Sequence, residues 1–233
     1  MSKVIGQGKG YEQKNMLEIG DKESGIVRWI PNKDNGEING KLINFIPTKK
    51  SIGLTVFPDI EEIVYGAFAF YEKDDYEWEA VPNNLQYISI PSSVKYIENG
   101  AFAFCDLERV EISDDCPAAK IEEGAVLSKD GKRFIYKLAE KEISDFVYRV
   151  PLGVEEIANE AFNSCEMDVE ISASVKKICE SAFAVFFGKV FVPKSVKKIE
   201  NHAFSKDCTL IVVKNSYAHK WAKKNKIKFE ISK

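Results

Sequence analysis

The stretch "VKKIENHAF", from Val196 to Phe204, nearly repeats "VKKICESAF", from Val175 to Phe183, which stands 21 residues earlier. The shared pattern is apolar-x-x-Ile-x-x-x-Ala-apolar, and it fits the chain six times. Its anchors are Ile60, Ile63, Ala67 and Phe68; Val94, Ile97, Ala101 and Phe102; Ala118, Ile121, Ala125 and Val126; Val154, Ile157, Ala161 and Phe162; Val175, Ile178, Ala182 and Phe183; and Val196, Ile199, Ala203 and Phe204. The alanines are spaced by 34, 24, 36, 21 and 21 residues, so two units carry insertions. A repeat of this length predicts a solenoid.

Each full unit also begins with a short run of strand-forming residues. The runs are "YISIPSSV" (Tyr87–Val94), "YRVPLGV" (Tyr148–Val154), "VEISASV" (Val169–Val175) and "KVFVPKSV" (Lys189–Val196). Short β-branched runs bounded by turn residues predict strands, and strands at a fixed period stack into a parallel sheet. We expect the Ala-Phe pair of each unit to pack beneath the strands, where a buried Phe contributes about 2 to 3 kcal/mol.

The pattern Ile-Pro-x-x-Val-x-x-Ile-x-x-x-Ala-Phe-x-x-Cys resembles the BspA-like leucine-rich repeat family. The stretches from Pro91 to Cys105 and from Pro151 to Cys165 fit this pattern, and the stretch from Pro193 to Phe204 fits all but the cysteine. The likeness covers roughly Gly53 to Lys233. It implies an α/β repeat, namely a leucine-rich-repeat solenoid with a right-handed coil, stacked short parallel strands, hairpin insertions and a short C-terminal capping helix.

The end of the repeat region resembles the family ending as well. The stretch "VVKNSYAHKWAKKNKIKF" runs from Val212 to Phe229, and Trp221 stands where the family has an aromatic residue. Ser216 is placed to cap a short closing helix, because a serine side chain can accept a hydrogen bond from the first turn. We therefore expect a C-terminal cap from about residue 209.

Two insertions contain turn signals. Asp130-Gly131 lies between two apolar runs and predicts a hairpin with a tight turn. Asn35-Gly36 and Asn39-Gly40 lie between "IVRWI" and "LINFI", which predicts a degenerate first coil from Gly25 to Pro47. Ser172 stands where other coils have proline, so we expect irregular pairing there.

The domain organisation follows from these segments. Residues 1–24 are polar and are expected to form an N-terminal cap or a flexible segment, and residues 25–233 a single solenoid. With 45% hydrophobic residues in 233, the chain can build a continuous core. The first twenty residues lack the apolar stretch of a secretory signal, which predicts a cytoplasmic protein, whereas the family resemblance allows a secreted or cell-surface one. We expect a monomer that does not insert into membranes.

The sequence predicts no catalytic residue, metal site or cofactor. Five cysteines occur without Cys-x-x-Cys spacing, and we expect all of them to be unpaired, with Cys105 and Cys165 buried as small apolar residues. A cysteine nucleophile would need a base, and the chain has only His202 and His219. His202 stands at a position that varies freely between coils, so we expect it to be solvated. Acid pairs such as Glu155-Glu156 are expected to project into water.

The charge is distributed unevenly. Residues 189–233 carry 12 Lys against three acids, a balance of +9, although the whole chain carries −3. Stacking of coils and the closing helix predicts a basic patch that could bind an anionic partner. Its residues are Lys176, Lys177, Lys197, Lys198, Lys220, Lys223 and Lys224. The alternative is that the last coil needs a polar outer face for solubility.

The segment "AFYEKDDYEWEAVPNN" interrupts the repeat before Pro91 and predicts a loop that leaves the solenoid. Tyr71, Tyr76 and Trp78 lie in it among acidic residues, and Tyr and Trp often dominate protein interfaces. The alternative is that these aromatics cover an edge of the solenoid. We expect a non-catalytic binding or adhesion scaffold whose partner is a protein or a glycan rather than nucleic acid. An enzyme with a site on inserted loops, or a purely structural repeat protein, are the alternatives.

Overall fold

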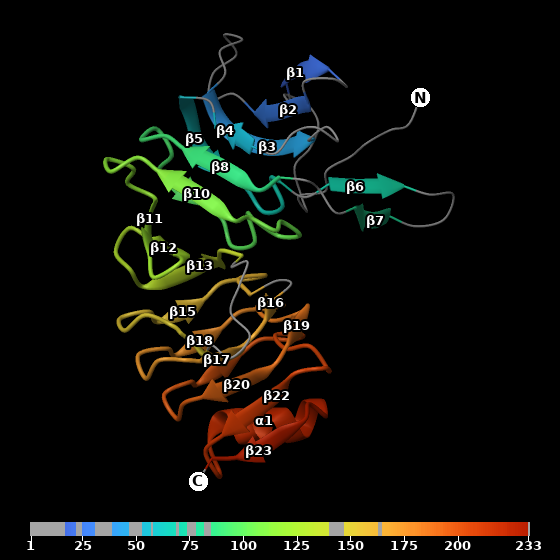
Figure 1. Ribbon diagram of the computed structural model, residues 1–233, viewed down its shortest axis with the longest axis vertical. Helices are drawn as coiled ribbons and strands as arrows, with labels where there is room; N and C mark the ends of the chain where they lie inside the picture. Colours follow the sequence, from blue (N-terminus) through green and yellow to red (C-terminus); the bar gives the residue numbers. More distant parts are fainter. Residues whose placement is uncertain are drawn as a thin grey trace. The chain divides into compact units, whose positions relative to one another are not determined.

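The computed structural model describes residues 17–21, 25–30, 39–46, 53–56, 58–68, 70–73, 78–81, 85–139, 147–162 and 165–232. The chain divides into two compact units, residues 1–121 and 122–233. The described residues form strands and, near the end of the second unit, a short helix (Figure 1). In each unit short strands stack in parallel from coil to coil, so the fold is a β-solenoid, as the repeat predicts.

The first unit contains three sheets among its described residues. Its strands are β1 (Leu17–Asp21), β2 (Gly25–Ile30), β3 (Asn39–Ile46), β4 (Gly53–Thr55), β5 (Asp59–Ile63), β6 (Phe70–Lys73), β7 (Trp78–Val81), β8 (Tyr87–Ile90), β9 (Tyr96–Ile97) and β10 (Arg109–Ile112), and β11 (Ala119–Glu122) lies at its end. One sheet has the order β1-β2-β3-β5-β9, antiparallel up to β3 and parallel beyond it. A parallel sheet has the order β10-β8-β4, and β6 pairs with β7 as an antiparallel hairpin.

The pairing of β2 with β3 confirms a hairpin in the degenerate first coil. Asn39-Gly40 lies at the start of β3 and not in the turn, and its ladder to β5 shifts register between Gly40 and Lys41. Asn35-Gly36 lies outside the described residues. Within the expected N-terminal segment, Leu17–Asp21 forms β1, which extends the same sheet.

The second unit repeats a two-sheet coil. Its elements are β12 (Ala125–Ser128), β13 (Arg133–Lys137), β14 (Val147–Arg149), β15 (Glu156–Ile157), β16 (Cys165–Glu166), β17 (Asp168–Glu170), β18 (Lys177–Ile178), β19 (Phe186–Phe187), β20 (Lys189–Val192), β21 (Lys198–Ile199), β22 (Thr209–Val212), α1 (Tyr217–Asn225) and β23 (Phe229–Ile231). One sheet includes β12-β13-β15-β18-β21, a second has the order β14-β17-β20-β22-β23, and β16 pairs with β19. Gly131, at φ 73°, closes the predicted hairpin between β12 and β13, where its amide donates to the Ser128 carbonyl.

Four of the coils turn after their first strand with the same backbone hydrogen bond. The amide of the first anchor donates to the carbonyl three residues earlier, and the donor-acceptor pairs are Val94 to Pro91 (3.3 Å), Val154 to Pro151 (3.4 Å), Val175 to Ser172 (3.1 Å) and Val196 to Pro193 (3.3 Å). Ser172 therefore makes the same turn as a proline, and its hydroxyl also donates to the Pro151 carbonyl at 3.2 Å. β17 pairs with β14 and β20 without a register shift, so the expected irregular pairing is wrong.

The same hydrogen bond corrects the third copy of the pattern. Here the amide of Cys116 donates to the Ser113 carbonyl at 2.8 Å, so Cys116 is the first anchor of this coil. Ala119, three residues later, is fully buried, whereas the predicted anchor Ile121 is 40% exposed. The predicted register at Ala118 and Ile121 was wrong because neither a proline nor a β-branched residue marks this turn.

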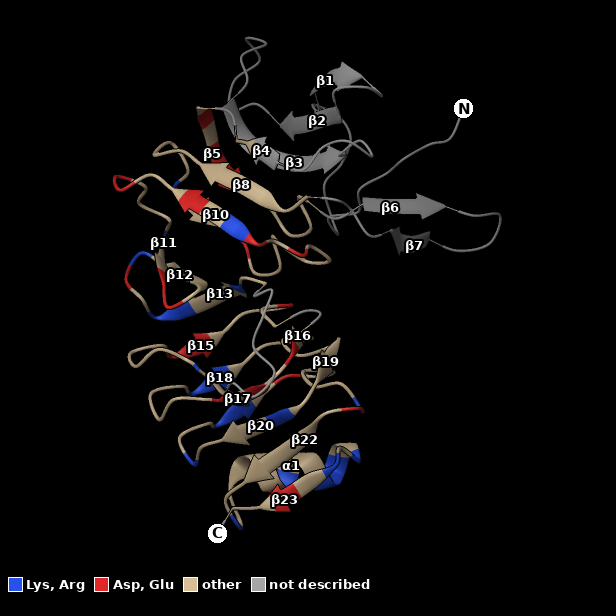
Figure 2. Cartoon of the chain, viewed as in Figure 1, with Lys and Arg blue, Asp and Glu red and all other residues tan. Residues whose placement is uncertain are grey.

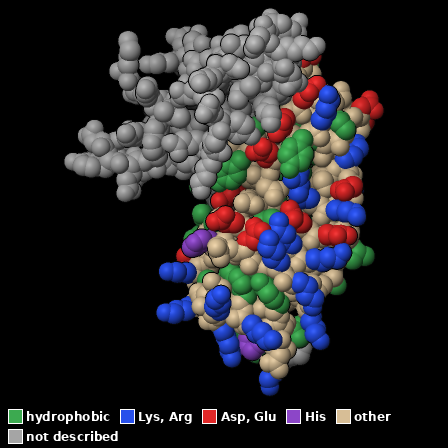
Figure 3. Space-filling view, turned by 180° about the vertical axis from the view of Figure 1, so that it is seen from behind, with side chains coloured by type: hydrophobic (Ala, Val, Ile, Leu, Met, Phe, Trp, Pro, Cys, Tyr) green, Lys and Arg blue, Asp and Glu red, His purple; other side chains and the backbone are tan. Residues whose placement is uncertain are grey.

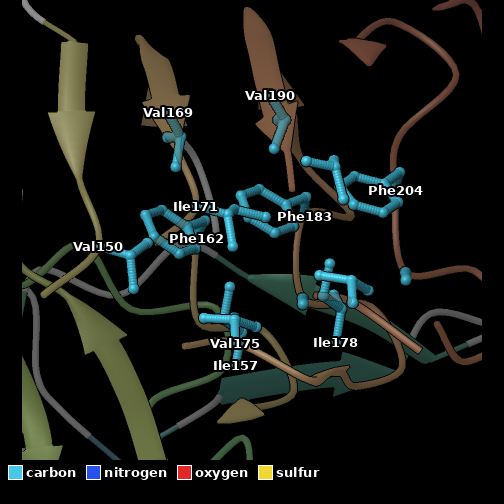
Figure 4. Close-up of a cluster of buried hydrophobic side chains, with 14 of the residues drawn as sticks. Val150, Ile157, Phe162, Val169, Ile171, Val175, Ile178, Phe183, Val190 and Phe204 are labelled. Carbon is cyan, nitrogen blue, oxygen red and sulfur yellow. The ribbon is translucent and has the colours of Figure 1, made fainter. Parts of the chain in front are cut away.

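The Ala-Phe pairs form the core, as predicted. In the second unit the rings of Phe162 and Phe183 stack with centroids 4.6 Å apart, and those of Phe183 and Phe204 stack at 5.0 Å (Figure 4). Phe134 of β13 continues this column on Phe162 at 4.8 Å. The first unit has its own stacked pair, Phe68 and Phe102. Because each ring buries its faces against the next coil, no coil is stable alone.

The position before each anchor alanine has a left-handed backbone. The φ angles are 65° at Gly66, 72° at Gly100, 70° at Gly124, 56° at Glu160, 57° at Ser181 and 54° at His202. The expectation that this position varies freely is therefore wrong for the backbone. Glycine occupies it without strain, whereas the other residues adopt a conformation that disfavours side chains.

The closing helix α1 covers the last coil. Ser216 caps it as predicted, because its hydroxyl accepts a hydrogen bond from the His219 amide at 3.1 Å. The helix ends at Lys226, which has a φ of 58°. Trp221 is buried and its ring meets Phe204 edge to face at 5.7 Å. Of the helices in the described part of the chain, none has the length and apolar character needed to cross a membrane.

Candidate binding surfaces

The exposed side of the β13-β15-β18-β21 ladder carries charges that alternate from β13 to β18 and then repeat with the same sign on β21. Arg133 lies opposite Glu156, Glu156 opposite Lys177, and Lys177 opposite Lys198. Figure 2 shows this alternation as blue on β13, red on β15 and blue on β18. Parallel strands in register bring residues one repeat apart into contact, so the coil spacing determines these neighbours.

Glu155, next to the ladder residue Glu156, forms ion pairs with lysines of the coils on both sides. Its carboxylate lies 3.0 Å from the Lys176 ammonium and 3.8 Å from that of Lys132. The hydrogen bond and the charge of Lys176, together with the charge of Lys132, hold the pKa of Glu155 below its usual value. The acid pair Glu155-Glu156 is therefore not merely solvated, because each member forms an ion pair with the next coil.

Lys177 lies between two carboxylates. Its ammonium is 3.0 Å from Glu156 and 3.5 Å from Glu200. Burial alone would lower the pKa of Lys177, but the hydrogen bonds to Glu156 and Cys179, together with the charges of these groups, outweigh burial and raise it. Lys198 donates to Glu200 at 2.8 Å and lowers the pKa of that carboxyl. Three lysines of the predicted basic patch, Lys176, Lys177 and Lys198, are thus already neutralised within the fold.

The remaining lysines of the predicted patch are placed differently. Lys197 is exposed, and its ammonium donates to the Lys194 carbonyl at 2.9 Å. Lys220, Lys223 and Lys224 lie exposed on α1. The structure therefore separates the predicted patch into a paired group on the sheet and an unpaired group toward the C-terminus. Anion binding by either group stays a prediction.

An open depression lies on the charged face. Its volume is about 430 Å³, and it is lined by Ser128, Asp130, Lys132, Arg133, Glu155, Glu156, Lys176 and Lys177. The hydrogen bond from Ser128 and that from the Lys132 amide lower the pKa of Asp130. Because the pKa values of Asp130 and Glu155 are lowered, both side chains are ionised at neutral pH. Such groups can bind charges, but a general acid needs a carboxyl with a raised pKa.

The histidines and cysteines have structural roles. His202 is exposed, as predicted. His219 is buried, its Nδ1 accepts a hydrogen bond from the Asn215 amide at 3.0 Å, and its ring packs on Phe229. None of the five cysteines forms a disulfide, as expected, and all five are buried. Burial raises the pKa of Cys179 to about 11 and that of Cys208 to about 12, so both remain thiols. No cluster of metal-ligating side chains occurs in the ranges that the structure describes.

The predicted interface loop contains a hairpin. β6 and β7 form a separate two-stranded sheet in which Tyr71 pairs with Ala80 and Lys73 pairs with Trp78. Tyr71 and Trp78 therefore stand two ladder positions apart on opposite strands, which is the spacing of positions on one face of an antiparallel pair. Tyr76 lies outside the described residues. The segment that was expected to leave the solenoid as a loop thus contains a two-stranded hairpin, and its role in binding stays a prediction.

One exposed cluster in the first unit was not predicted from the sequence. The Tyr87 hydroxyl donates to Glu111 at 2.6 Å, and the Arg109 guanidinium lies 5.5 Å from the centre of the Tyr87 ring and pairs with Glu111. The hydrogen bond to Glu111 raises the pKa of Tyr87 and lowers that of Glu111. The signal was available, because Tyr87 and Arg109 occupy equal positions in two strands that stack in register.

The coil geometry and the closing cap define a leucine-rich-repeat type of solenoid. The sequence profile described as "BspA type Leucine rich repeat region" matches six copies in residues 74–128 and 141–222. These matches cover more than half of the chain, and the protein belongs to the BspA-type leucine-rich repeat family. A search of curated proteins found no match.

Three solved structures are similar to this chain. The pneumococcal vaccine antigen PcpA is 18% identical over 68% of this chain and 50% of its own, with a TM-score of 0.44, so the chain spans half the length of that antigen. A leucine-rich repeat protein of Eubacterium ventriosum is 13% identical over 84% of this chain and 72% of its own, with a TM-score of 0.36. A leucine-rich cell surface protein of Faecalibacterium prausnitzii is 16% identical over 78% of this chain and 60% of its own, with a TM-score of 0.42.

Proposed function

We propose that this protein is a non-catalytic scaffold that binds another protein through the β6–β7 hairpin. The observation that carries the proposal is the hairpin itself, which interrupts the coil between β5 and β8 and pairs as a sheet of its own. Insertions on a rigid repeat scaffold commonly carry function, because the scaffold supplies stability and the insertion is free to vary.

The residues of the hairpin favour a protein partner. Tyr71 and Trp78 belong to the two residue types that most often dominate protein interfaces. They stand two positions apart on opposite strands of one antiparallel ladder, which is the spacing of one face, so a partner could contact both at once. The acids beside them, Glu72 and Glu79, oppose each other across the ladder and would deter association with unselected apolar or acidic surfaces.

The charged depression supports a role without catalysis. Its carboxylates Asp130 and Glu155 are held ionised, and Lys132 and Lys176 serve as ion-pair partners of Glu155. Side chains that neutralise one another are not poised to transfer a proton to a substrate. Binding of a protein partner requires no particular compartment, so the proposal holds for a cytoplasmic protein and for one at a cell surface.

A double variant, Tyr71→Ala with Trp78→Ala, tests the proposal. Immobilised wild-type protein would be used to capture partners from bacterial lysate and from host matrix extract, and each captured protein would be purified and titrated by surface plasmon resonance. We expect the double variant to weaken binding of the true partner at least about tenfold, because buried aromatic anchors contribute several kcal/mol to an interface.

Tyr96→Ala is the matched control, because Tyr96 is an aromatic residue of the same unit with 48% of its surface exposed. It should leave the affinity for the partner unchanged. If the hairpin variant lowers the melting temperature by many degrees, the aromatics cover the scaffold and the site assignment is wrong. Unchanged affinity of the hairpin variant for every purified partner would also refute it.

A further inference from the structure

The lysines near the C-terminus differ from those on the charged ladder in having no carboxylate partner. Among the described residues from 189 to 232, the lysines that form no ion pair are Lys194, Lys197, Lys206, Lys214, Lys220, Lys223, Lys224, Lys226 and Lys228. Figure 3 shows blue side chains gathered at this end of the second unit, with red side chains farther up.

The acids of the same stretch are already engaged. Glu200 pairs with Lys177 and Lys198, and Glu230 lies 3.7 Å from Lys189. Asp207 accepts a hydrogen bond from the Ser205 hydroxyl at 3.5 Å. The positive charge of this end is therefore not neutralised by neighbouring side chains. A concentration of uncompensated cations attracts anions and raises their local concentration.

Helix α1 presents part of this charge on a rigid support. Its inner side is fixed by the buried Ala218, Trp221 and Ala222. Its exposed side carries Lys220, Lys223 and Lys224, which lie three and four residues apart and so share a face. Tyr217, 40% exposed, stands one turn before Lys220. An aromatic ring thus lies beside a row of ammonium groups.

We propose that this C-terminal basic surface, made of Tyr217, Lys220, Lys223 and Lys224, binds a linear anionic glycan. The lysines supply point charges for carboxylate, sulfate or phosphate groups along the polymer. The exposed ring of Tyr217 supplies an apolar face for the C–H groups of a sugar ring. The surface lies in the second unit and is independent of the hairpin proposed to bind a protein.

Other polyanions fit the surface less well. A lipid bilayer is disfavoured because the apolar side of α1 is packed inward and leaves little apolar surface to enter the membrane. Single-stranded nucleic acid is disfavoured because it stacks successive bases on several aromatic rings, and the exposed face of α1 offers one, Tyr217. An acidic protein would normally require an apolar centre in the interface.

The test is a titration of the full chain with a heparin oligosaccharide at low and physiological salt. A triple variant, Lys220→Gln, Lys223→Gln and Lys224→Gln, should bind roughly 10- to 100-fold more weakly and show a smaller salt dependence, because it loses three cationic contacts. Its melting temperature should remain within about two degrees of wild type. Tyr217→Ala should weaken heparin binding but leave inorganic polyphosphate binding unchanged.

The matched control removes three paired lysines with the same change in net charge: Lys132→Gln, Lys176→Gln and Lys189→Gln. It should alter heparin affinity by roughly threefold or less, since these ammonium groups are already neutralised. An equal loss in both triple variants would mean that only net charge matters and would overturn the site. Binding of single-stranded DNA, polyglutamate or anionic vesicles as tightly as heparin would overturn the assignment to a glycan.

Discussion

In the second unit, the same 21-residue spacing aligns the buried phenylalanine rings (the inner column) and the exposed charged side chains (the outer rows). The column repeats the same residue type from coil to coil, whereas the rows do not. Inside, the step places Phe162, Phe183 and Phe204 ring on ring. Outside, the same step places Lys176 beside Glu155, one repeat earlier. A buried ring must match its neighbour in shape, whereas an exposed side chain is constrained only weakly. The coil therefore fixes its interior and leaves its exterior free for ion pairing, solubility or binding.

The largest expected effect comes from the middle of the column. Phe183 contacts Phe162, Phe204 and Phe186, and its ring is fully buried. Phe183→Ala should lower the free energy of unfolding by about 3 to 5 kcal/mol, because it leaves a cavity between two coils. Urea unfolding followed by circular dichroism would measure this loss. If the free energy of unfolding of the variant lies within about 0.5 kcal/mol of the wild-type value, the interior is no more constrained than the exterior, and the comparison is wrong.

Two glycines extend the same contrast to the backbone. Gly188 has a φ of 150°, and a Cβ there would overlap the backbone carbonyl of Met167 in the preceding coil. Gly153 has a φ of 102°, and a Cβ added there would have no other atom within 4 Å. Gly188→Ala should therefore destabilise by about 2 to 4 kcal/mol and Gly153→Ala by about 1 to 2 kcal/mol. Equal losses in thermal melts would mean that close approach between coils is unimportant.

Glu160 is a charged type of residue that is nevertheless buried. Its burial predicts that the stability of the protein depends on pH. Burial, and to a smaller extent the charge of Glu180, raise the pKa of Glu160 to about 7. Between about pH 4.5 and 7 the folded state retains a proton that the unfolded state has lost, so the free energy of unfolding falls as pH rises through this window. The loss should approach about 3 kcal/mol above pH 7.

The neutral variant Glu160→Gln removes this titration. Its stability relative to wild type should increase between about pH 4.5 and 7 and level off above about pH 7 in urea unfolding experiments. A difference that stays constant over that range would contradict the raised pKa. The prediction sharpens the comparison, because the pH dependence comes from a carboxyl that the coil buries.

The smallest expected change in stability comes from the residue before the anchor alanine, whose backbone is left-handed. His202 is exposed and has a φ of 54°, so its side chain contributes little packing while its backbone is strained. His202→Gly should stabilise by up to about 1 kcal/mol, because glycine adopts this conformation freely and only part of the gain is lost to unfolded-chain entropy. Differential scanning calorimetry should show a rise in melting temperature, and a fall would refute the strain.

Much of the fold could be predicted because the interior repeats. The anchors at Val154, Ile157, Ala161 and Phe162 are all fully buried, as the pattern predicts. The third copy failed where the turn uses Ser113 and the anchors are Cys116 and Ala119, since these small residues resemble loop residues in sequence. What identifies them is a backbone hydrogen bond, which no residue pattern encodes.

Less of the candidate surfaces could be predicted. The neighbouring lysines of β18 and β21 follow from the 21-residue step. The pairing of Glu155 with Lys176 follows from the same step, but it was overlooked because acid pairs are usually solvated. The backbone strain at Glu160 was not predicted, although the glycines at the equivalent positions, Gly66 and Gly100, are typical of a left-handed backbone. A repeat thus predicts which residues of successive coils become neighbours. It does not predict the φ angle or the burial of a single polar residue.

The most direct test compares two double-mutant cycles within the same coils by equilibrium unfolding. The inner cycle combines Phe162→Ala with Phe183→Ala, and the outer cycle combines Glu155→Gln with Lys176→Gln. Stacked interior rings should show a coupling energy of about 1 kcal/mol or more, whereas the exposed ion pair should show less than about 0.5 kcal/mol. Inner coupling indistinguishable from zero, or outer coupling as large as the inner, would contradict a fold held by its interior column and free on its exterior.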